Sequence, residues 1–411
     1  MKHLHEIVSH FDIEGTVLSV EPLGSGLIND TYRVATDGPR DYVLQRINHA
    51  IFRDVDLLQR NVSLITDHIR TKLEARGETD IERKCLRFVP ARDGKMYHFD
   101  GERYWRVSVL IPRSQTFETV NPEFAYHTGK AFGDFQSMLV DLPEPLGETI
   151  PNFHNMEFRL ETFRQSVQDD KAGRLAEAQW LVDELLVRAD EMCRAEQLHR
   201  QGLLPKRITH CDTKVNNMLF DEEGRVLCVI DLDTTMPGYV LSDFGDFMRT
   251  AGNTGAEDDE DLDRVGLDMD IFRAFARGYI ESARSFLLPV EIELLPYGAK
   301  LLTYMQTVRF LTDYLDGDTY YKIKSPRHNW QRSLAQFRHL QSIEEHEAEM
   351  LDFIRQLLYN VVRCRSPEMF ISGWMLFHRF GFPDVCGTRV GTCRRHVRIY
   401  ERRQAGAASA L

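Results

Sequence analysis

A block of short strands and loops between residues 207 and 234 constrains the fold of this chain more than any other feature. It contains the runs Arg207-Ile208-Thr209-His210-Cys211-Asp212-Thr213-Lys214-Val215-Asn216-Asn217 and Val229-Ile230-Asp231-Leu232-Asp233. Apolar runs alternate with polar segments, and Asp221-Glu222-Glu223-Gly224-Arg225 has turn composition, which predicts strand, loop, strand, turn and strand. The polar residues fall in the loop and directly after the last strand. The block therefore predicts a site carried by a β-hairpin.

The spacing of these polar residues, H-x-D-x-K-x-x-N with an acidic pair beginning 14 residues after Asn217, indicates a chemistry. Phosphoryl transfer from Mg·ATP needs an acceptor for a hydroxyl proton, a cation beside the phosphate and oxygen ligands for the metal. Asp212 can orient the hydroxyl and take its proton, and Lys214 can offset charge on the phosphate. Asn217 and Asp231 offer oxygens to Mg²⁺, and Asp233 is either a second ligand or an acceptor behind the ligands. The block predicts a small-molecule kinase with ATP as co-substrate.

Two nearby residues are expected to support this loop without taking part in the chemistry. His210 is interpreted as a structural histidine that pins the loop backbone. Asp243-Phe244-Gly245 resembles the magnesium-binding D-F-G of protein kinases, but it lies 26 residues after Asn217, whereas Asp231 has the right spacing for that role. We therefore expect Asp243 to cap or brace the start of a helix and to hold the catalytic loop through its backbone.

A glycine-containing segment near the N-terminus is the candidate nucleotide-binding element. Gly24-Ser25-Gly26, followed by Asn29, lies between two predicted strands, and glycines there would let backbone N–H groups approach a phosphate. Gly-x-Gly alone usually marks a plain hairpin turn, but here it precedes a helix and a catalytic loop in the order found in kinases. Protein kinases carry a lysine on the third strand, where this chain has Gln45-Arg46; one of these side chains would serve the phosphates, or the loop and metal would suffice.

The whole pattern predicts an α+β chain with a bilobal, protein-kinase-like fold. Residues 1–112 are expected to form an antiparallel sheet with one main helix that covers ATP, and residues 113–358 a helical lobe with the catalytic loop and the sugar pocket, with adenine near residues 110–113. Residues 359–411, which contain no lysine, are expected to be an atypical tail. Helices are predicted at 2–11, 55–74, 122–140, 156–169, 174–200, 268–285, 290–316 with a break at Pro296, and 330–358.

Composition excludes several other classes of protein. The net charge of −12 provides no basic surplus for phosphates, so no nucleic-acid partner is expected. No apolar stretch of about 18 residues is present, and no membrane partner is expected. The seven cysteines are odd in number and scattered, which favours neither a disulfide framework nor a zinc site. A cytoplasmic monomer is expected.

Several longer stretches resemble a known family. They are Gly24-Ser25-Gly26-Leu27-Ile28-Asn29-Asp30-Thr31-Tyr32, Phe132-Gly133-Asp134-Phe135-Gln136, Thr149-Ile150-Pro151-Asn152-Phe153-His154, Asp231-Leu232-Asp233-Thr234-Thr235-Met236-Pro237-Gly238 and Arg309-Phe310-Leu311-Thr312-Asp313-Tyr314-Leu315-Asp316-Gly317-Asp318. From about residue 5 to 358 the chain resembles the aminoglycoside phosphotransferase/choline kinase superfamily, and within it the N-acetylhexosamine 1-kinases.

The resemblance implies ATP-dependent phosphorylation of the anomeric hydroxyl of N-acetylglucosamine or N-acetylgalactosamine. It implies that Asp212 is the base, that Asn217 and Asp231 hold magnesium, and that Arg309, Tyr320 and His154 contact the sugar. An ordinary alternative for Arg309 is an ion pair with Asp313, one helical turn away.

Three other functions stay open at this point. The same fold could act on another hydroxyl, such as that of an amino alcohol, homoserine or an aminoglycoside. The chain could be an inactive nucleotide-binding protein, although Asp212, Lys214, Asn217 and Asp231 are all present. It could also be a metal-dependent phosphohydrolase built on His210, Asp212, Asp231 and Asp233, although such sites usually have more histidine ligands.

Overall fold

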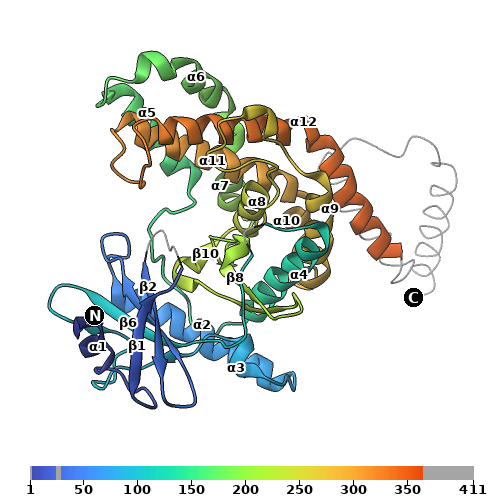
Figure 1. Ribbon diagram of the computed structural model, residues 1–411. Helices are drawn as coiled ribbons and strands as arrows, with labels where there is room; N and C mark the ends of the chain where they lie inside the picture. The colour runs from blue at the N-terminus through green and yellow to red at the C-terminus, as the bar shows by residue number, and fades with distance from the viewer. Residues whose placement is uncertain (1, 25–28, 118, 364–411) are drawn as a thin grey trace, which may run out of the picture. The chain divides into compact units, whose positions relative to one another are not determined.

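The computed structural model describes residues 2–24, 29–117 and 119–363 (Figure 1). The chain divides into two compact units, residues 1–351 and 352–411. The second unit is described only to the end of the last helix, α12 (His328–Arg363), so most of the expected tail lies outside the described residues. The finer division into lobes at residues 1–112, 113–358 and 359–411 stays a prediction.

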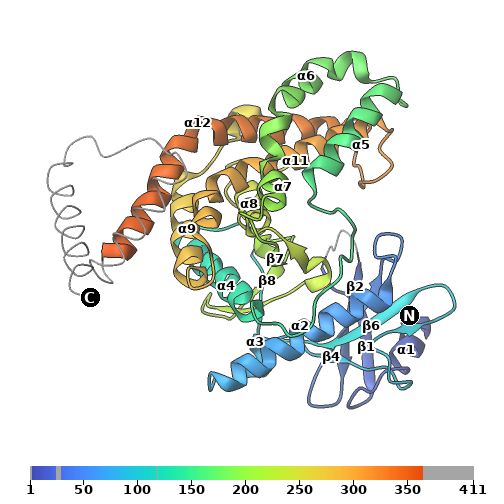
Figure 2. The ribbon, with the colours of Figure 1, turned by 180° about the vertical axis from the view of Figure 1, so that it is seen from behind.

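The N-terminal part contains a six-stranded antiparallel sheet with strand order β1-β2-β3-β6-β4 and β5 paired to β6 (Figure 2). Its strands are β1 (Val17–Pro22), β2 (Asp30–Thr36), β3 (Tyr42–Ile47), β4 (Phe88–Val89), β5 (His98–Phe99) and β6 (Tyr104–Val109). The helices α1 (Lys2–Val8) and α2 (Val55–Ala75) contribute to two separate apolar clusters. This sheet and its one long helix confirm the architecture predicted for the region.

Alternation along the strands decides which side chains face the rest of the molecule. Leu44 on β3 and Val107 on β6 are fully buried in a cluster that also contains Ile7 and Phe11. Neighbouring residues on a strand point to opposite faces, so Gln45 and Arg106 lie on the other face. The second apolar cluster, which includes Leu58 of α2, also contains Leu232 from the site block. Buried apolar surface therefore runs continuously from α2 to the predicted site.

The remainder of the described chain is mostly helical, as predicted, with short strands in the 207–238 block. The elements are α3 (Ile81–Lys84), α4 (Pro122–Leu139), α5 (Met156–Asp169), α6 (Leu175–Met192), α7 (Arg194–Arg200), β7 (Arg207–Thr209), η1 (Val215–Asn217), β8 (Met218–Phe220), β9 (Val226–Val229), η2 (Leu232–Thr234), β10 (Met236–Gly238), α8 (Val240–Thr250), η3 (Leu262–Arg264), α9 (Met269–Ala283), α10 (Pro289–Glu293) and α11 (Leu295–Leu315). Among the described helices, none is both long and apolar enough to cross a bilayer.

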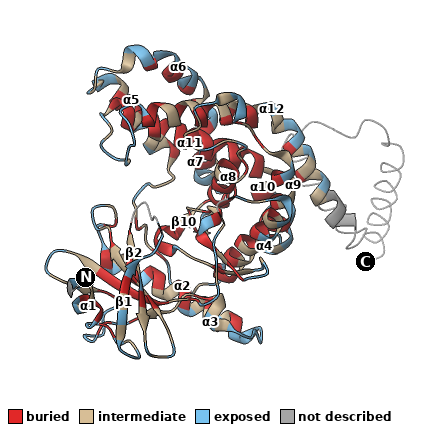
Figure 3. Ribbon diagram, viewed as in Figure 1, coloured by how far each residue is buried: buried red, intermediate tan, exposed pale blue. Residues whose placement is uncertain are grey.

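The structure differs from the predicted elements in three places. The helix expected at 174–200 is divided at Cys193 into α6 and α7. The helix expected at 290–316 is also divided, and Pro296 falls in the first turn of α11, where its missing N–H costs nothing. The sequence did not predict the strand β10 or the full extent of α8. The helix α8 is almost entirely buried, and its polar residues Asp243, Asp246 and Arg249 pair with protein groups and not with solvent (Figure 3).

Close helix packing explains why a glycine follows Asp243-Phe244. The helices α8 and α11 touch at Gly245, where a Cβ atom would lie 2.1 Å from the carbonyl oxygen of Gly298. A second close contact joins α9 to α4 at Gly278, where a Cβ would lie 2.0 Å from the carbonyl oxygen of Tyr126. The Gly245 contact holds α8 against α11, and α8 carries Asp243, whose carboxylate bonds to the catalytic loop.

Candidate functional site

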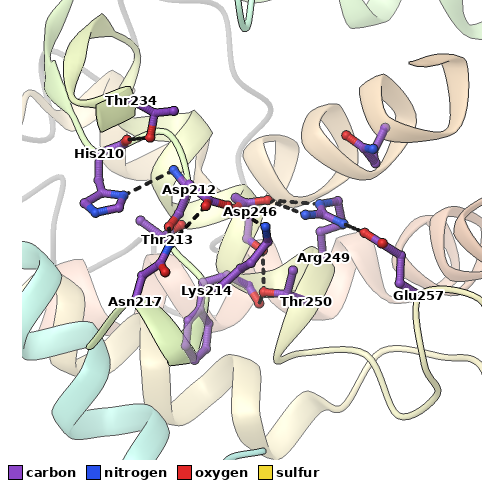
Figure 4. Close-up of polar contacts among 12 residues, drawn as sticks. His210, Asp212, Thr213, Lys214, Asn217, Thr234, Asp246, Arg249, Thr250 and Glu257 are labelled. Carbon is purple, nitrogen blue, oxygen red and sulfur yellow. Dashed lines mark hydrogen bonds and ion pairs between the residues drawn. The ribbon is translucent and has the colours of Figure 1, made fainter. Parts of the chain in front are cut away.

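The catalytic loop lies between two small antiparallel strand pairs. The strand before it, β7, pairs with β10, and the strand after it, β8, pairs with β9. Within the loop Cys211 has φ of 63°, a left-handed conformation that a non-glycine residue adopts only when its surroundings hold it. Thr234 donates a hydrogen bond from its hydroxyl to the carbonyl of His210 at 2.8 Å and so ties the turn after β9 to the loop (Figure 4).

Asp243 holds the backbone of this loop from below. Its carboxylate accepts hydrogen bonds from the backbone N–H groups of His210, at 2.9 Å, and Cys211, at 2.8 Å. The amide of Gln136 donates to the same carboxylate at 2.6 Å, and the Thr213 hydroxyl donates to the Asp243 carbonyl at 2.5 Å. The prediction that Asp243 braces the loop from a helix start is confirmed.

His210 is a structural residue, as predicted. Its side chain is fully buried, and its Nε2 lies 2.8 Å from the carbonyl oxygen of Ile230. Its Nδ1 accepts from the backbone N–H of Asp212 at 3.3 Å. Both ring nitrogens are therefore occupied. Within the described chain no three His, Cys, Asp or Glu side chains are grouped to hold a metal, so the geometry does not favour the phosphohydrolase alternative.

Asp212, Lys214 and Asn217 meet at the centre of the loop (Figure 4). The Lys214 Nζ lies 2.8 Å from Asp212 Oδ1, and the Asn217 amide donates to Asp212 Oδ2 at 2.9 Å. Burial disfavours the charged form of Asp212, but Lys214 outweighs this effect and the pKa of Asp212 is lowered. The charge of Asp212 in turn raises the pKa of Lys214 well above its usual value. At neutral pH the structure therefore holds a carboxylate beside an ammonium group.

Asp231 and Asn217 provide the oxygens best suited to a metal ion. The Asn217 amide nitrogen points to Asp212, and no hydrogen bond from a described residue reaches its Oδ1. Asp231 has φ of 59°, a left-handed conformation, and no described residue pairs with its carboxylate. Solvent reaches Asp231, yet protein surrounds it, and this desolvation together with Asp233 and Asp212 raises the pKa of Asp231 to about 6. Two hard oxygen donors beside open solvent fit Mg²⁺, which keeps several waters.

Asp233 has a different environment from Asp231. Its two oxygens accept from the Arg106 guanidinium at 2.6 and 2.9 Å, and Asn29 donates to Oδ2 at 2.7 Å. Both Arg106 and Asp233 are almost completely buried. Gln45 accepts from Arg106 Nε at 3.0 Å, so Asn29 and Gln45, predicted to bind nucleotide, both belong to this cluster. The metal role of Asp233 stays a prediction, but in this structure a cation of the protein occupies both its oxygens.

Sequence reasoning missed Arg106. The only signal was an arginine between Trp105 and Val107, inside an apolar strand where a buried charge needs a partner. Of the glycine segment, the structure describes Gly24, which has φ of 71° and an open space around its α-carbon. Ser25 and Gly26 lie outside the described residues, so their predicted contact with the nucleotide stays a prediction.

The predicted sugar-site residues come from two loops and one helix. His154 lies before α5, Arg309 on α11, and Tyr320 in the loop after α11. The guanidinium carbon of Arg309 lies 5.1 Å from the ring centre of Phe153, 6.0 Å from that of Tyr320 and 5.7 Å from that of Tyr321. The structure thus brings Arg309 and Tyr320 together, with Phe153 and Tyr321 as neighbours that the sequence did not identify.

His154 lies near both this aromatic group and the catalytic loop. Burial, reinforced by the charges of Arg309 and Arg159, holds the pKa of His154 well below its usual value, while the charge of Asp212 acts in the opposite direction. Its Nδ1 is buried without a hydrogen-bond partner among the described residues. A neutral imidazole with a free ring nitrogen can exchange a hydrogen bond with an uncharged ligand.

The ion pair considered for Arg309 and Asp313 does not form. Asp313 instead accepts backbone hydrogen bonds from Thr319 and Tyr320, each at 2.8 Å, and from Tyr321 at 3.0 Å. One carboxylate therefore shapes the loop that carries both tyrosines. No carboxylate within the described residues forms an ion pair with Arg309, whose positive charge is left available to a ligand.

Ion pairs tie the acidic run at residues 257–261 to its surroundings near the site. Glu257 pairs with the buried Arg249 at 2.6 Å, and Arg249 also pairs with Asp246 at 2.8 Å (Figure 4). Asp258 pairs with Lys324 at 2.7 Å. The run thus balances nearby cations, and most of its charge near the site is already neutralised.

Comparison with known families gives one match to a family. The sequence model of the APH family, described as a phosphotransferase enzyme family, matches residues 19–278, which is more than half of the 411 residues. The match includes the sheet, the catalytic loop and α8. It ends before Arg309 and Tyr320.

Solved structures give a second comparison. An aminoglycoside phosphotransferase from Alicyclobacillus acidocaldarius is 14% identical, with a TM-score of 0.54 and coverage of 85% of this chain and 96% of that chain. Amicoumacin kinase hAmiN, in complex with AMP-PNP, Ca²⁺ and Ami, is 14% identical, with a TM-score of 0.53 and coverage of 84% and 93%. A choline/ethanolamine kinase family protein from Mesorhizobium loti is 16% identical, with a TM-score of 0.51 and coverage of 86% and 99%. These likenesses confirm the predicted α+β, bilobal kinase-like fold.

Proposed function

The chain belongs to the APH phosphotransferase enzyme family, and we propose that it transfers the γ-phosphoryl group of Mg·ATP to the anomeric hydroxyl of an N-acetylhexosamine. The product is a sugar 1-phosphate, and the enzyme works as a cytoplasmic monomer. The resemblance to sugar 1-kinases motivates the choice of acceptor. Three solved structures with this fold are named for other acceptors, so the acceptor must be argued from the residues of this chain.

The catalytic loop supplies the roles that such a transfer needs. Asp212 accepts a hydrogen bond from the anomeric hydroxyl, aligns it for in-line attack and takes its proton as the new O–P bond forms. Lys214, 2.8 Å from Asp212, offsets negative charge on the transferred group. Asn217 Oδ1 and Asp231 would hold magnesium, which when bound neutralises charge on the phosphate oxygens. Asp243 keeps the loop in position through its backbone contacts.

One observation favours a neutral acceptor over a cationic one: the protein's own cation already lies among the aromatic rings. Sites for choline-like ammonium groups use open aromatic faces, commonly with carboxylates nearby. Here Arg309 lies 5.1 to 6.0 Å from the ring centres of Phe153, Tyr320 and Tyr321, and no described carboxylate pairs with it. A second cation would be repelled, whereas the hydroxyl and acetamido oxygens of a sugar can accept hydrogen bonds from Arg309.

Acceptor turnover tests this proposal directly. ADP release from Mg·ATP is measured with N-acetylglucosamine, N-acetylgalactosamine, glucose, choline, homoserine and an aminoglycoside, and phosphorus NMR identifies any product. We expect turnover with at least one N-acetylhexosamine and a phosphorus signal coupled to the anomeric proton. The 1,5-anhydro sugar, which lacks the anomeric hydroxyl, is the matched control and should not react. Turnover only with choline, homoserine or the aminoglycoside would overturn the acceptor while leaving the family unchanged.

A further inference from the structure

A buried arginine on the sheet, Arg106, joins the sheet to the turn that follows Asp231. The register of the sheet pairs Gln45 on β3 directly with Arg106 on β6. Gln45 accepts from Arg106 Nε at 3.0 Å, and the guanidinium carbon lies 5.3 Å from the ring centre of Phe88. Gln45, one of the two β3 residues near the position where protein kinases carry a lysine, is a neutral amide, and the buried positive charge lies on the adjacent strand.

The partner of this arginine is held from several sides. Asp233 receives two hydrogen bonds from Arg106, at 2.6 and 2.9 Å, and one from Asn29, at 2.7 Å. Its carbonyl oxygen accepts from the hydroxyl of Thr149 at 2.7 Å. A bidentate guanidinium–carboxylate pair fixes orientation as well as distance. The turn η2 begins directly after Asp231. It is thus anchored to β6 by Arg106, to Asn29 near the glycine segment, and to the loop before α5 by Thr149.

We propose that Arg106 is a positioning residue of the phosphotransferase site, which holds the metal-binding Asp231 in place through Asp233 and makes Asp233 a structural anchor and not a metal ligand. This inference rests on the metal site of the proposed function and does not depend on which sugar is the acceptor. It deepens that function because it assigns different roles to two acidic residues that the D-x-D spacing alone cannot distinguish.

Two physical points support the assignment. Asp231 is exposed and no described residue pairs with its carboxylate, so its oxygens can reach a solvated cation, whereas Asp233 is 2% exposed and both its oxygens accept hydrogen bonds from Arg106. Asp231 also needs support, because φ of 59° is unfavourable for an aspartate unless neighbouring contacts hold the turn. Arg106 supplies that support and neutralises Asp233, which would otherwise add a second negative charge close to Asp231.

The test distinguishes an anchoring role of Asp233 from a metal-binding role by asking whether loss of Arg106 weakens or strengthens Mn²⁺ binding. Mn²⁺ binding to the enzyme–ADP complex is measured by calorimetry for the wild type and for the Arg106→Gln, Asp233→Asn and double variants. If Arg106 positions Asp231, Arg106→Gln weakens Mn²⁺ binding by about tenfold, a typical cost of losing support behind a metal ligand. If Asp233 were a ligand, removing the nearby cation would leave Mn²⁺ binding unchanged or strengthen it. Unchanged or tighter binding in Arg106→Gln overturns the proposal.

Non-additivity provides the second criterion. Arg106 and Asp233 act as one unit in this proposal, so the double variant should bind Mn²⁺ no more weakly than either single variant and should melt at a higher temperature than both. Additive losses in metal affinity would overturn it. Affinity for ADP without metal should not change in any variant, a result that a general loss of structure would not give. The matched control is Arg33→Gln, which removes an exposed arginine of β2 that pairs with Asp41. This variant should resemble the wild type.

Two further variants keep every outcome decisive. If Arg106→Gln does not fold, Arg106→Lys keeps the charge but loses the bidentate geometry; weakened Mn²⁺ binding supports the proposal and wild-type binding refutes it. Asp231→Asn should abolish the Mn²⁺-dependent gain in ADP affinity. If the wild type itself shows no such gain, the metal site of the proposed function fails together with this inference. If only Arg106→Gln behaves as wild type, the proposed function stands and this inference alone fails.

Discussion

In the proposed function, the phosphate side of the site, around Asp212 and Asp231, and the acceptor side, around Arg309 and His154, differ in charge. On the phosphate side, Asp212, Asp231 and Asp233 lie in the catalytic loop and the turn after β9, Asp243 lies on α8, and all but Asp231 are held by protein donors. On the acceptor side, Arg309 lies among aromatic rings without a carboxylate partner in the described chain, and His154 is neutral. Protein donors therefore hold the carboxylates of Asp212, Asp233 and Asp243, whereas the charge of Arg309 is available to a ligand.

This difference explains how one site can bind two dissimilar molecules. The acidic side lacks only the cations that arrive with the nucleotide, because Asp231 and Asn217 Oδ1 are the oxygens left open. On the cationic side, the oxygens of the proposed sugar would accept hydrogen bonds from Arg309. Each side is thus complementary to one substrate and poorly suited to the other, so the two ligands have little tendency to exchange places.

The largest expected effect follows from changing Asp212, at the centre of the phosphate side. Asp212→Asn removes the proton acceptor but keeps the size of the side chain, so turnover should fall by roughly a thousandfold, the scale of general base catalysis. ADP affinity and the melting temperature should stay close to those of the wild type, because Asp243 and not Asp212 holds the loop backbone. Steady-state kinetics with a melting curve checks both. Turnover near that of the wild type would contradict the role of base.

The next prediction concerns Asp231, whose carboxylate has no partner among the described residues. Asp231 has a pKa raised to about 6 from 3.8, so it becomes neutral as the pH falls through 6 and can no longer ligate a metal. The Mg²⁺-dependent gain in ADP affinity should therefore decrease below pH 6 by up to about tenfold per pH unit, since one proton competes with the metal. Calorimetry between pH 5 and 8, with and without Mg²⁺, measures this gain.

The same pKa shift has the opposite consequence for stability. A carboxyl group with a raised pKa stays protonated in the folded state at a pH where the unfolded chain is ionised, so stability falls as the pH rises from about 4 to about 6 and stays lower above pH 6. The metal-free Asp231→Asn variant should therefore melt at a higher temperature than the wild type at pH 7.5, and the difference should vanish below pH 4. Equal melting temperatures at pH 7.5 would show that the charge of Asp231 does not destabilise the metal-free protein.

The two sides also differ in how far the sequence predicts them. Asp212, Lys214 and Asn217 lie within six residues of one another, so their spacing predicted their meeting, and the roles of His210 and Asp243 followed from the same local pattern. The Asp233 environment could not be predicted in this way. It depends on Arg106, which is 127 residues distant, and local periodicity carries no information about which buried charges pair across such a separation.

The acceptor side was predicted only through family resemblance. No spacing rule connects His154 to Arg309, and the helical spacing of Arg309 and Asp313 favoured an ion pair that does not form. The backbone explains why. Gly317 and Asp318 both have positive φ, and the chain turns there so that the N–H groups of the following loop bond to Asp313. The Asp313 carboxylate is therefore occupied by loop donors and not by Arg309. A rule about side chains on one helix cannot include donors from the loop that follows it.

A smaller effect tests the cationic side. Arg309→Met removes the charge and its N–H donors but keeps an apolar chain beside the rings, so kcat/KM for the sugar should fall by roughly 10- to 100-fold, as for the loss of a charged hydrogen bond. The KM for ATP should not change. Arg309→Lys should recover part of the loss. If Arg309→Met gains turnover with choline, the arginine also excludes cationic acceptors; an unchanged kcat/KM for the sugar would remove Arg309 from the acceptor site.

The smallest effect tests whether the acceptor side depends on the loop that Asp313 shapes. Asp313→Asn retains the side-chain volume but replaces one carboxylate oxygen with a donor, so at least one of the three loop N–H groups loses its partner. Each unsatisfied group costs about 1–3 kcal/mol when buried, less where water can reach it, and the loop should loosen without unfolding the helix beneath it. The KM for the sugar should rise a few-fold while kcat and the KM for ATP stay constant, since neither Asp212 nor Lys214 contacts this loop. A fall in kcat with an unchanged sugar KM would show instead that Asp313 acts on the phosphate side, and the division between the two sides would fail.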